Sequence, residues 1–453
     1  MTSSPGGRKV RPNPLDMPAL ALALAAFVFL AWRQHQLVNR YAVNVLYWDQ
    51  WAYYDVLFQN RGWWSTFNFQ VGPHRMGMGF VVTRILAHLS GWDSRWDAFG
   101  VSFTLILAAG LAWKLALRCG VRAGLSLIAI PLLFFNRHEY AAFSETANIS
   151  HGAMPLLLIM LFCLAWFLRR PGWRITVLAA LTFLLIFTGF GLFIGVIAPM
   201  LLGLEGLQAL RSGDRSRCVW AMLAILVISA GWLLFLRNYI YTAAIPNFRF
   251  PYERPHEYFL FMAIMLANFL GVAHAGALVL WVGAVFAGAV LAVLAVYGRR
   301  IVRRGVAEEP VNTVIFALAA FEVAYLINTA IGRVMLGLDE APIASRYVIL
   351  MIPGGLAVFL ALATCARPKL ARRLSVAFAL LLIPATAFLR TSEQNALDGF
   401  STGRRNWKEA YLRTHSESEA SKVSHFDVFP FPVSDKLMFL ETRHLNLFNG
   451  DPR

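Results

Sequence analysis

The sequence places one carboxylate among aromatic residues, in a pattern suited to acid–base chemistry. Asp49 lies in the run YWDQW, where Tyr47, Trp48 and Trp51 surround it. Partial loss of water around such a carboxylate would make it a stronger base. A loop aspartate more commonly caps a helix or pairs with an arginine. The sequence therefore predicts a catalytic base at Asp49, with a structural role as the alternative.

Two arginines that end successive apolar runs are candidates for binding a phosphate. The run GRVMLGLDEAPIASRY contains Arg333 and Arg346, and Tyr347 follows the second arginine. The planar guanidinium group donates two parallel hydrogen bonds, which suits a phosphate. Arginines at span ends also reach toward lipid headgroups. We expect Arg333, Arg346 and Tyr347 to bind a donor phosphate, with lipid anchoring as the alternative.

Other polar residues lie in segments expected outside the membrane. His74 and Arg75 occur in GPHRMGMGF, and Glu145, Asn148 and His151 occur in NRHEYAAFSETANISHG. Imidazole, amide and carboxylate groups can all form hydrogen bonds with sugar hydroxyls. Each of these residues could equally belong to an ordinary hydrated loop. We predict that they contribute to substrate binding.

The sequence does not firmly imply a cofactor. It has no phosphate-binding glycine loop, no HExxH, no GxSxG and no paired-cysteine motif, so soluble nucleotide chemistry is not supported. Cys119, Cys163, Cys218 and Cys365 lie within apolar runs or beside basic loops, which indicates neither a disulfide framework nor a metal site. A divalent metal is possible but is not predicted.

Membrane helices must position these residues. Of 453 residues, 58% are hydrophobic and 15% are charged, too little polar surface for one soluble core. Several apolar runs approach the roughly 20 residues that a helix needs to cross a bilayer. We predict an all-α polytopic membrane protein with about eleven transmembrane helices. The expected spans are 17–33, 98–117, 123–136, 152–168, 174–188, 191–210, 218–236, 276–297, 311–331, 347–365 and 373–390.

Small clusters of Lys and Arg set the expected orientation. They lie between apolar runs, as at 118–122, 299–304 and 367–373, and short basic loops stay in the cytoplasm. Because the net charge of +16 is divided among these clusters, we do not expect nucleic acid binding. No small-residue cleavage site follows the first apolar run, so it is expected to remain as a span.

This orientation divides the chain into three parts. Residues 1–16 form a cytoplasmic N-terminus, residues 17–390 form the transmembrane domain, and residues 391–453 form a small periplasmic tail. The first periplasmic loop is 34–97, and the apolar segments 76–90 and 258–273 are expected to be interfacial helices. Within the expected span 311–331, Glu322 is a mid-span acid for which we predict a structural or substrate-lining role.

The chain resembles the GT-C superfamily of glycosyltransferases that use polyprenyl-phosphate sugars. The resemblance comes from the acid of YWDQW after the first span, the HR of GPHRMGMGF, and the GR and SRY of a later outer loop. It implies a bacterial inner-membrane protein with a periplasmic active site and Asp49 as the base. Asp49 is followed by Gln50, whereas the family often has two adjacent carboxylates, so a metal-bridged site is less expected. The large soluble outer domain of the oligosaccharyltransferase branch is also missing.

The resemblance implies transfer of a monosaccharide, with inversion, from a polyprenyl-phosphate donor to a lipid-linked or cell-envelope glycan acceptor. The expected partners are this donor, this acceptor and membrane lipid. One alternative is a transporter or flippase of a lipid-linked or amphipathic substrate, but transporters usually bind near the midplane, whereas these polar residues lie in outer loops. Another is an O-antigen polymerase or ligase, whose longest outer loop generally comes later in the chain.

Overall fold

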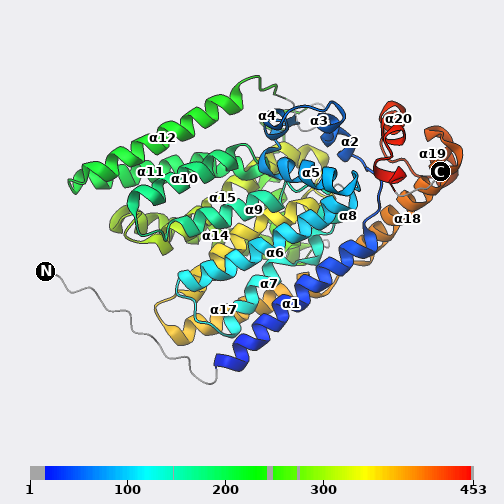
Figure 1. Ribbon diagram of the computed structural model, residues 1–453. Coiled ribbons are helices and arrows are strands. Elements are labelled where there is room, and N and C mark those ends of the chain that lie inside the picture. The colour runs from blue at the N-terminus through cyan, green and yellow to red at the C-terminus, as the bar shows by residue number, and fades with distance from the viewer. Residues whose placement is uncertain (1–15, 146, 242–247, 273–275, 450–453) are drawn as a thin grey trace.

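The computed structural model describes residues 16–145, 147–241, 248–272 and 276–449, and these residues are predominantly helical (Figure 1). The strands within these ranges are β1 (Gln70–Val71) and β2 (His74–Arg75), which pair antiparallel in one short hairpin. Of the predicted cytoplasmic N-terminus, residues 1–15 lie outside the described residues, as do residues 450–453 of the tail. The prediction of an all-α membrane protein is confirmed in its class.

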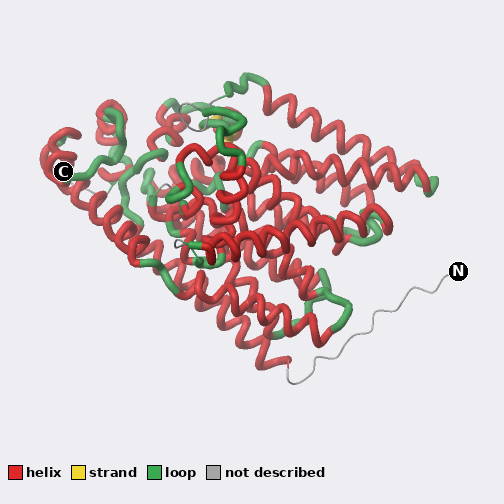
Figure 2. The backbone as a smooth tube through the Cα atoms, turned by 180° about the vertical axis from the view of Figure 1, so that it is seen from behind, coloured by secondary structure: helices red, strands yellow, loops and turns green. Residues whose placement is uncertain are grey.

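Eight helices in the described part of the chain are long and apolar enough to cross a bilayer. They run side by side, with the connecting loops gathered mainly at their ends (Figure 2). The α-helices of these spans are α1 (Asp16–Tyr41), α6 (Arg95–Arg118), α11 (Leu192–Arg211), α12 (Arg215–Leu236), α14 (Ala277–Arg304), α15 (Pro310–Arg333), α16 (Ile352–Ala363) and α17 (Pro368–Ala387). The 3₁₀ helices η3 (Gly189–Gly191) and η6 (Ser345–Met351) lead directly into α11 and α16.

Shorter helices occupy the other three predicted spans. They are α7 (Ala129–Phe134), which follows η1 (Leu125–Ile128), α9 (Ala153–Ala165) and α10 (Pro171–Ile186). α9 packs between α6 and α10, and α7 packs on α1 and α17. Since these helices are shorter than the roughly 20 residues of a full span, the number of eleven spans remains a prediction.

The first outer loop and the tail share a second hydrophobic core. The loop contains α2 (Gln50–Tyr53), α3 (Asp55–Phe58), α4 (Trp63–Phe67) and α5 (Gly77–Ser90), and the tail contains α18 (Thr391–Thr414), α19 (Glu417–Ser424), α20 (Ser434–Thr442) and η7 (Asn446–Phe448). Trp51 and Tyr54 of the loop are buried in one cluster with Trp407 and Leu437 of the tail. These helices lie together at one end of the bundle (Figure 1).

The remaining elements connect the spans. They are η2 (Arg137–Glu139), α8 (Ala141–Ser144), α13 (His256–Phe269), η4 (Val334–Leu336) and η5 (Ala341–Ile343). α13 packs closely on α14, because a Cβ added at Gly283 would lie 1.8 Å from the carbonyl oxygen of Ala263. The interfacial position predicted for this segment remains a prediction.

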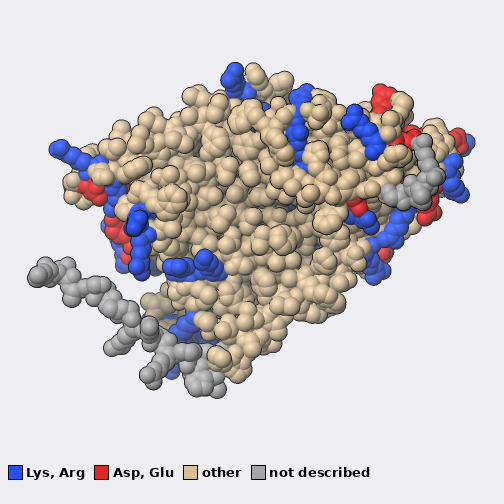
Figure 3. Space-filling view, in the orientation of Figure 1, with Lys and Arg blue, Asp and Glu red and all other residues tan. Residues whose placement is uncertain are grey.

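Charged side chains gather at the two ends of the bundle. Figure 3 shows mainly Lys and Arg, with a few Asp and Glu, at the end where α1 begins, and a mixture of both signs at the end that carries the tail. The surface between these ends has few charged groups in this view. A bilayer requires such an apolar belt because it offers no water to charged groups.

Candidate functional site

A cavity of about 410 Å³ lies where the first outer loop meets the ends of the spans. Its walls come from the start of α2, the β1–β2 hairpin, the segment before α9, the end of α15 and the start of η6. Seven of the nine predicted site residues line it, namely Asp49, His74, Asn148, His151, Arg333, Arg346 and Tyr347. Segments that are far apart in the sequence thus form one site.

The backbone before α2 positions Asp49. Trp48 has a positive φ of 50°, and its N–H donates to the carbonyl of Val428 in the tail at 2.8 Å. Asp49 directly precedes α2 but makes no side-chain capping bond, so a capping role does not account for its carboxylate. Its Oδ2 accepts a hydrogen bond from the Tyr53 hydroxyl at 3.4 Å. The carboxylate is partly exposed, and it faces the cavity.

Two arginines lie at the two ends of the connection between α15 and η6. Arg333 is the last residue of α15, and Arg346 is the second residue of η6. The Arg346 guanidinium lies over the Tyr347 ring, 5.5 Å from its centroid. Among the described residues, Asp49 and Arg346 form no ion pair, although both line the cavity. A negatively charged ligand therefore has access to Arg346 without displacing Asp49.

Two histidines form part of the wall. The rings of His74 and His151 meet edge to face with centroids 5.8 Å apart, and Phe190 lies 4.2 Å from the first ring. Burial is the main cause that lowers the pKa of His74 to about 3, with smaller contributions from His151 and Arg333. Burial, aided by the charges of Arg346 and Arg333, lowers the pKa of His151 to about 4. Both imidazoles are therefore neutral near pH 7. Each has a buried nitrogen, Nδ1 of His74 and Nε2 of His151, without a hydrogen-bond partner in the described structure.

Tyr53 links Asp49 to Asn148, and the sequence prediction missed it. Its buried hydroxyl bonds to both Asp49 and Asn148, and burial together with the Asp49 charge raises its pKa. The signal was available, because residues four apart on a helix share a face. Asn328 and Thr329 also line the cavity, about one turn before Arg333 on α15. They were missed because they lie inside an apolar run.

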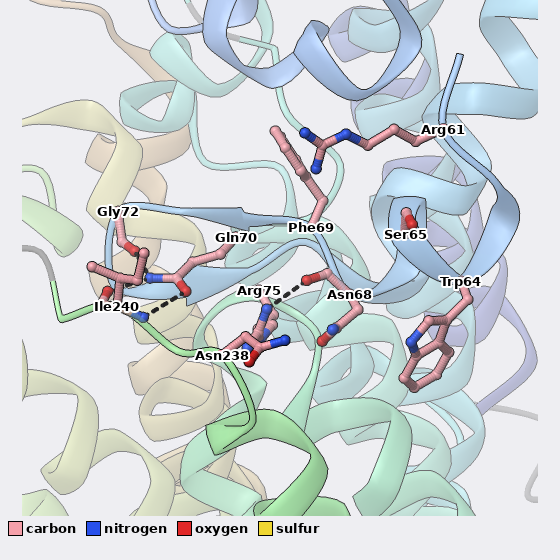
Figure 4. Close-up of a pocket in the computed structure, with 10 residues that line it drawn as sticks. All are labelled: Arg61, Trp64, Ser65, Asn68, Phe69, Gln70, Gly72, Arg75, Asn238 and Ile240. Atoms are coloured by element: carbon pink, nitrogen blue, oxygen red, sulfur yellow. Dashed lines mark hydrogen bonds between the residues drawn. The ribbon is translucent and has the colours of Figure 1, made fainter. Parts of the chain in front are cut away.

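Arg75 does not line this cavity. Its Nη2 donates to the carbonyls of Phe235 at 2.7 Å and Arg237 at 2.9 Å, and its Nη1 donates to Asn68 at 2.7 Å (Figure 4). These carbonyls belong to the end of α12 and to the first outer loop. Arg75 therefore clamps the two segments together, and its guanidinium is occupied by structural bonds.

Glu145 also lies outside the cavity wall. Burial raises the pKa of its carboxyl, while the charges of Arg346 and Arg404 oppose that rise. Its charge in turn favours the charged form of Arg346. Glu322 is fully buried in α15, where its Oε2 accepts from the Gly354 N–H at 3.1 Å, and it does not line the cavity. This contact corresponds to the structural role among those predicted for Glu322.

The four cysteines are all free, and no group of three or more His, Cys, Asp or Glu side chains in the described residues is arranged to hold a metal ion. No protein-family model matches the chain, and no curated protein and no solved structure is significantly similar to it. The function must therefore be inferred from the cavity.

Proposed function

We propose that the protein is a membrane glycosyltransferase that moves a monosaccharide from a polyprenyl-phosphate donor to a lipid-linked or cell-envelope glycan. One observation carries this proposal. A carboxylate, Asp49, and two guanidinium groups, Arg333 and Arg346, line one cavity together with neutral hydrogen-bonding side chains. Such a set provides a base, a phosphate site and partners for sugar hydroxyls within one space.

The reaction assigns a separate task to each group. The acceptor hydroxyl oxygen bonds to the anomeric carbon while the bond from that carbon to the phosphate oxygen breaks. The hydroxyl proton passes to Asp49, and the electron pair of the broken bond leaves with the polyprenyl phosphate. Arg346 and Arg333 stabilise that negative charge in a space where water is partly excluded. Attack from the face opposite the phosphate inverts the anomeric configuration.

His74, His151 and Asn148 are suited to holding the sugar. A neutral imidazole both donates and accepts a hydrogen bond, and an amide does the same through two atoms. The unpartnered ring nitrogens in the cavity would then bond to sugar hydroxyls. Neutral groups are preferable here, because a cation would compete with the arginines for the donor phosphate.

We further propose eleven spans in a bacterial cytoplasmic membrane, with the site on the outer face. The tail packs on the first outer loop, so both lie on the same side. An even number of crossings would instead return the tail to the side where α1 begins. The eight long spans therefore need an odd number of the shorter helices to cross as well. If α7, α9 and α10 all cross, the protein has eleven spans. Every wall of the cavity would then lie at the outer ends of the spans.

The test is turnover by purified protein in lipid nanodiscs. The substrates are a radiolabelled polyprenyl-phosphate sugar and a membrane glycan extract, and release of polyprenyl phosphate is measured. Asp49→Asn should slow release by about 10²- to 10⁴-fold, the usual contribution of a general base. Donor capture should persist in this variant, whereas Arg346→Ala should weaken capture as well as turnover.

Two matched variants control for folding. Asp55→Asn removes a carboxylate of the same loop that pairs with Lys436 outside the cavity. Arg254→Ala removes an exposed arginine between the spans α12 and α14 that also lies outside the cavity. Both should retain turnover. Undiminished release by Asp49→Asn would refute the base, and unchanged donor capture by Arg346→Ala would leave that arginine as a lipid anchor.

A further inference from the structure

A second cavity of about 520 Å³ lies on the other side of the β1–β2 hairpin from the proposed catalytic cavity. Gly72, at the turn of the hairpin, lines both cavities. The lining residues that matter here are Arg61, Trp64, Asn68, Gln70, Gly72 and Asn238 (Figure 4). A smaller cavity of about 270 Å³ shares Trp64, Asn68 and Asn238 with it, so the two form one groove. We name this the hairpin groove.

The groove combines a flat aromatic surface with side-chain amides. Trp64 is 53% exposed, so the part of its indole that does not pack on Phe67 is available to a ligand. The Asn68 and Asn238 side chains lie near each other on the wall (Figure 4). Oδ1 of Asn68 is buried and has no hydrogen-bond partner among the described residues. An unpaired buried acceptor is costly, and a hydroxyl donor entering the groove would remove that cost.

These groups suit a neutral saccharide better than a phosphate. The Arg75 guanidinium is bonded to three carbonyls, and Nε of Arg61 donates to Gln59 at 2.7 Å. Both guanidinium groups keep their positive charge, because these acceptors are neutral, but the unpaired acceptor Oδ1 of Asn68 suits a hydroxyl donor better than a phosphate oxygen. The C–H groups on one face of a pyranose pack on the electron-rich face of an indole, while its hydroxyls bond to amides.

The wall of the groove is held in place before any ligand arrives. Gln70 Nε2 donates to the carbonyls of Ile240 at 2.6 Å and Gly72 at 2.8 Å, and its Oε1 accepts from Ile240 N–H at 3.3 Å. The Trp64 ring stacks on Phe67 with centroids 5.6 Å apart. A preorganised wall reduces the entropy lost on binding.

We infer that the hairpin groove binds the glycan acceptor, and that the glycan crosses the hairpin turn at Gly72 to present its terminal hydroxyl to Asp49. The identity of this saccharide as the acceptor rests on the proposed function. Binding of a saccharide to the groove does not. The absence of a side chain at Gly72 suits this crossing, because no Cβ rises between the two cavities.

The probe is an array of neutral oligosaccharides built from glucose, galactose, mannose, arabinose or N-acetylglucosamine. Wild-type protein in nanodiscs should bind at least one of them, and the best of these is then titrated. Trp64→Ala should weaken its binding about tenfold, which corresponds to about 1.4 kcal/mol. Asn68→Ala should weaken it as well. Trp96→Ala, which removes an indole of 49% exposure at the start of α6, should bind like wild type.

The outcomes separate this inference from the proposed function. Suppose that the Asp49→Asn variant binds an oligosaccharide and that this binding depends on Trp64, while the wild type transfers no sugar from any donor. This result would support the groove and refute the transferase. Transfer by Trp64→Ala with an unchanged KM for the acceptor would refute the groove alone. If both hold, Trp64→Ala raises this KM about tenfold with little change in kcat. Equal array binding by Trp64→Ala and wild type, or binding only to anionic lipid vesicles, would overturn the inference.

Discussion

The neutral histidine pair predicts a loss of stability in mild acid. His74 and His151 stay neutral in the fold, because their pKa values are lowered to about 3 and about 4. In the unfolded chain each takes up a proton near pH 6.5. As the pH falls below 6.5, the unfolded state binds more protons than the native state, so the free energy of unfolding decreases. The loss ends near the folded pKa values, where the native imidazoles also become charged.

The size of the effect follows from the two shifts. For each histidine that stays neutral in the fold, the free energy of unfolding falls by about 1.4 kcal/mol per pH unit below 6.5. Lowering the pH from 7 to 5 therefore reduces it by about 2 kcal/mol per histidine. The two together remove about 4 kcal/mol, because neither is protonated in the native state at pH 5. Burial raises the pKa values of Glu139 and Glu145, and these carboxyls act in the opposite direction. The comparison must therefore be made between variants.

The assay is unfolding of the protein in detergent at a series of pH values between 7.5 and 5, followed by intrinsic fluorescence. The double variant His74→Gln/His151→Gln should lose about 4 kcal/mol less than wild type over the interval from pH 7 to 5. His256→Gln, at an exposed position, should behave like wild type. Histidine resonances provide a direct check by NMR. A native midpoint near 6 for either histidine, or equal losses in the double variant and wild type, would refute this account of the cavity.

Two further perturbations test the supports of the site. Gly79→Ala would place a Cβ 2.5 Å from the Cα of Ser150, so it should lower the free energy of unfolding by about 1–3 kcal/mol, whereas Gly110→Ala has open space and should be neutral or stabilising in the same unfolding assay. Glu393 accepts from His138 at 2.8 Å and is buried, so Glu393→Gln should destabilise by about 2–3 kcal/mol at pH 7. Because interactions with His138 and neighbouring groups lower the Glu393 pKa, this difference should shrink as the pH falls below 4.5, and a constant difference would contradict the charge interaction.

The sequence predicted the helical segments well, because a bilayer leaves the backbone few alternatives. Helices begin or end close to most of the expected span limits, as at Arg118 of α6 and Arg211 of α11. Span lengths were less predictable. Residues 135–145 and 147–152 form turns and short helices, so α7 ends at Phe134 and α9 begins at Ala153. Hydropathy shows that a run of residues is apolar. It does not show whether the run forms one long helix or a short helix whose ends are buried by other parts of the protein.

Site residues could be proposed from their type and their expected side of the membrane, but not from their orientation. Arg75 follows His74 directly, yet only His74 lines the cavity. The difference arises because successive residues of a strand point to opposite faces. The partners that engage Arg75 lie at Phe235 and Arg237, about 160 residues further along the chain. No local pattern could have indicated that these carbonyls would be nearby.

The depth of the polar groups favours an enzyme over a transporter. A transporter must offer polar contacts through the bilayer, and its substrate site lies near the midplane. On α15 the polar residues that line the cavity are Asn328, Thr329 and Arg333, all within its last two turns. Glu322, deeper on the same helix, bonds to a backbone N–H instead and is absent from the cavity wall. A substrate in this cavity would thus meet its polar contacts near one end of the spans, which fits the proposed transfer from a lipid-linked donor.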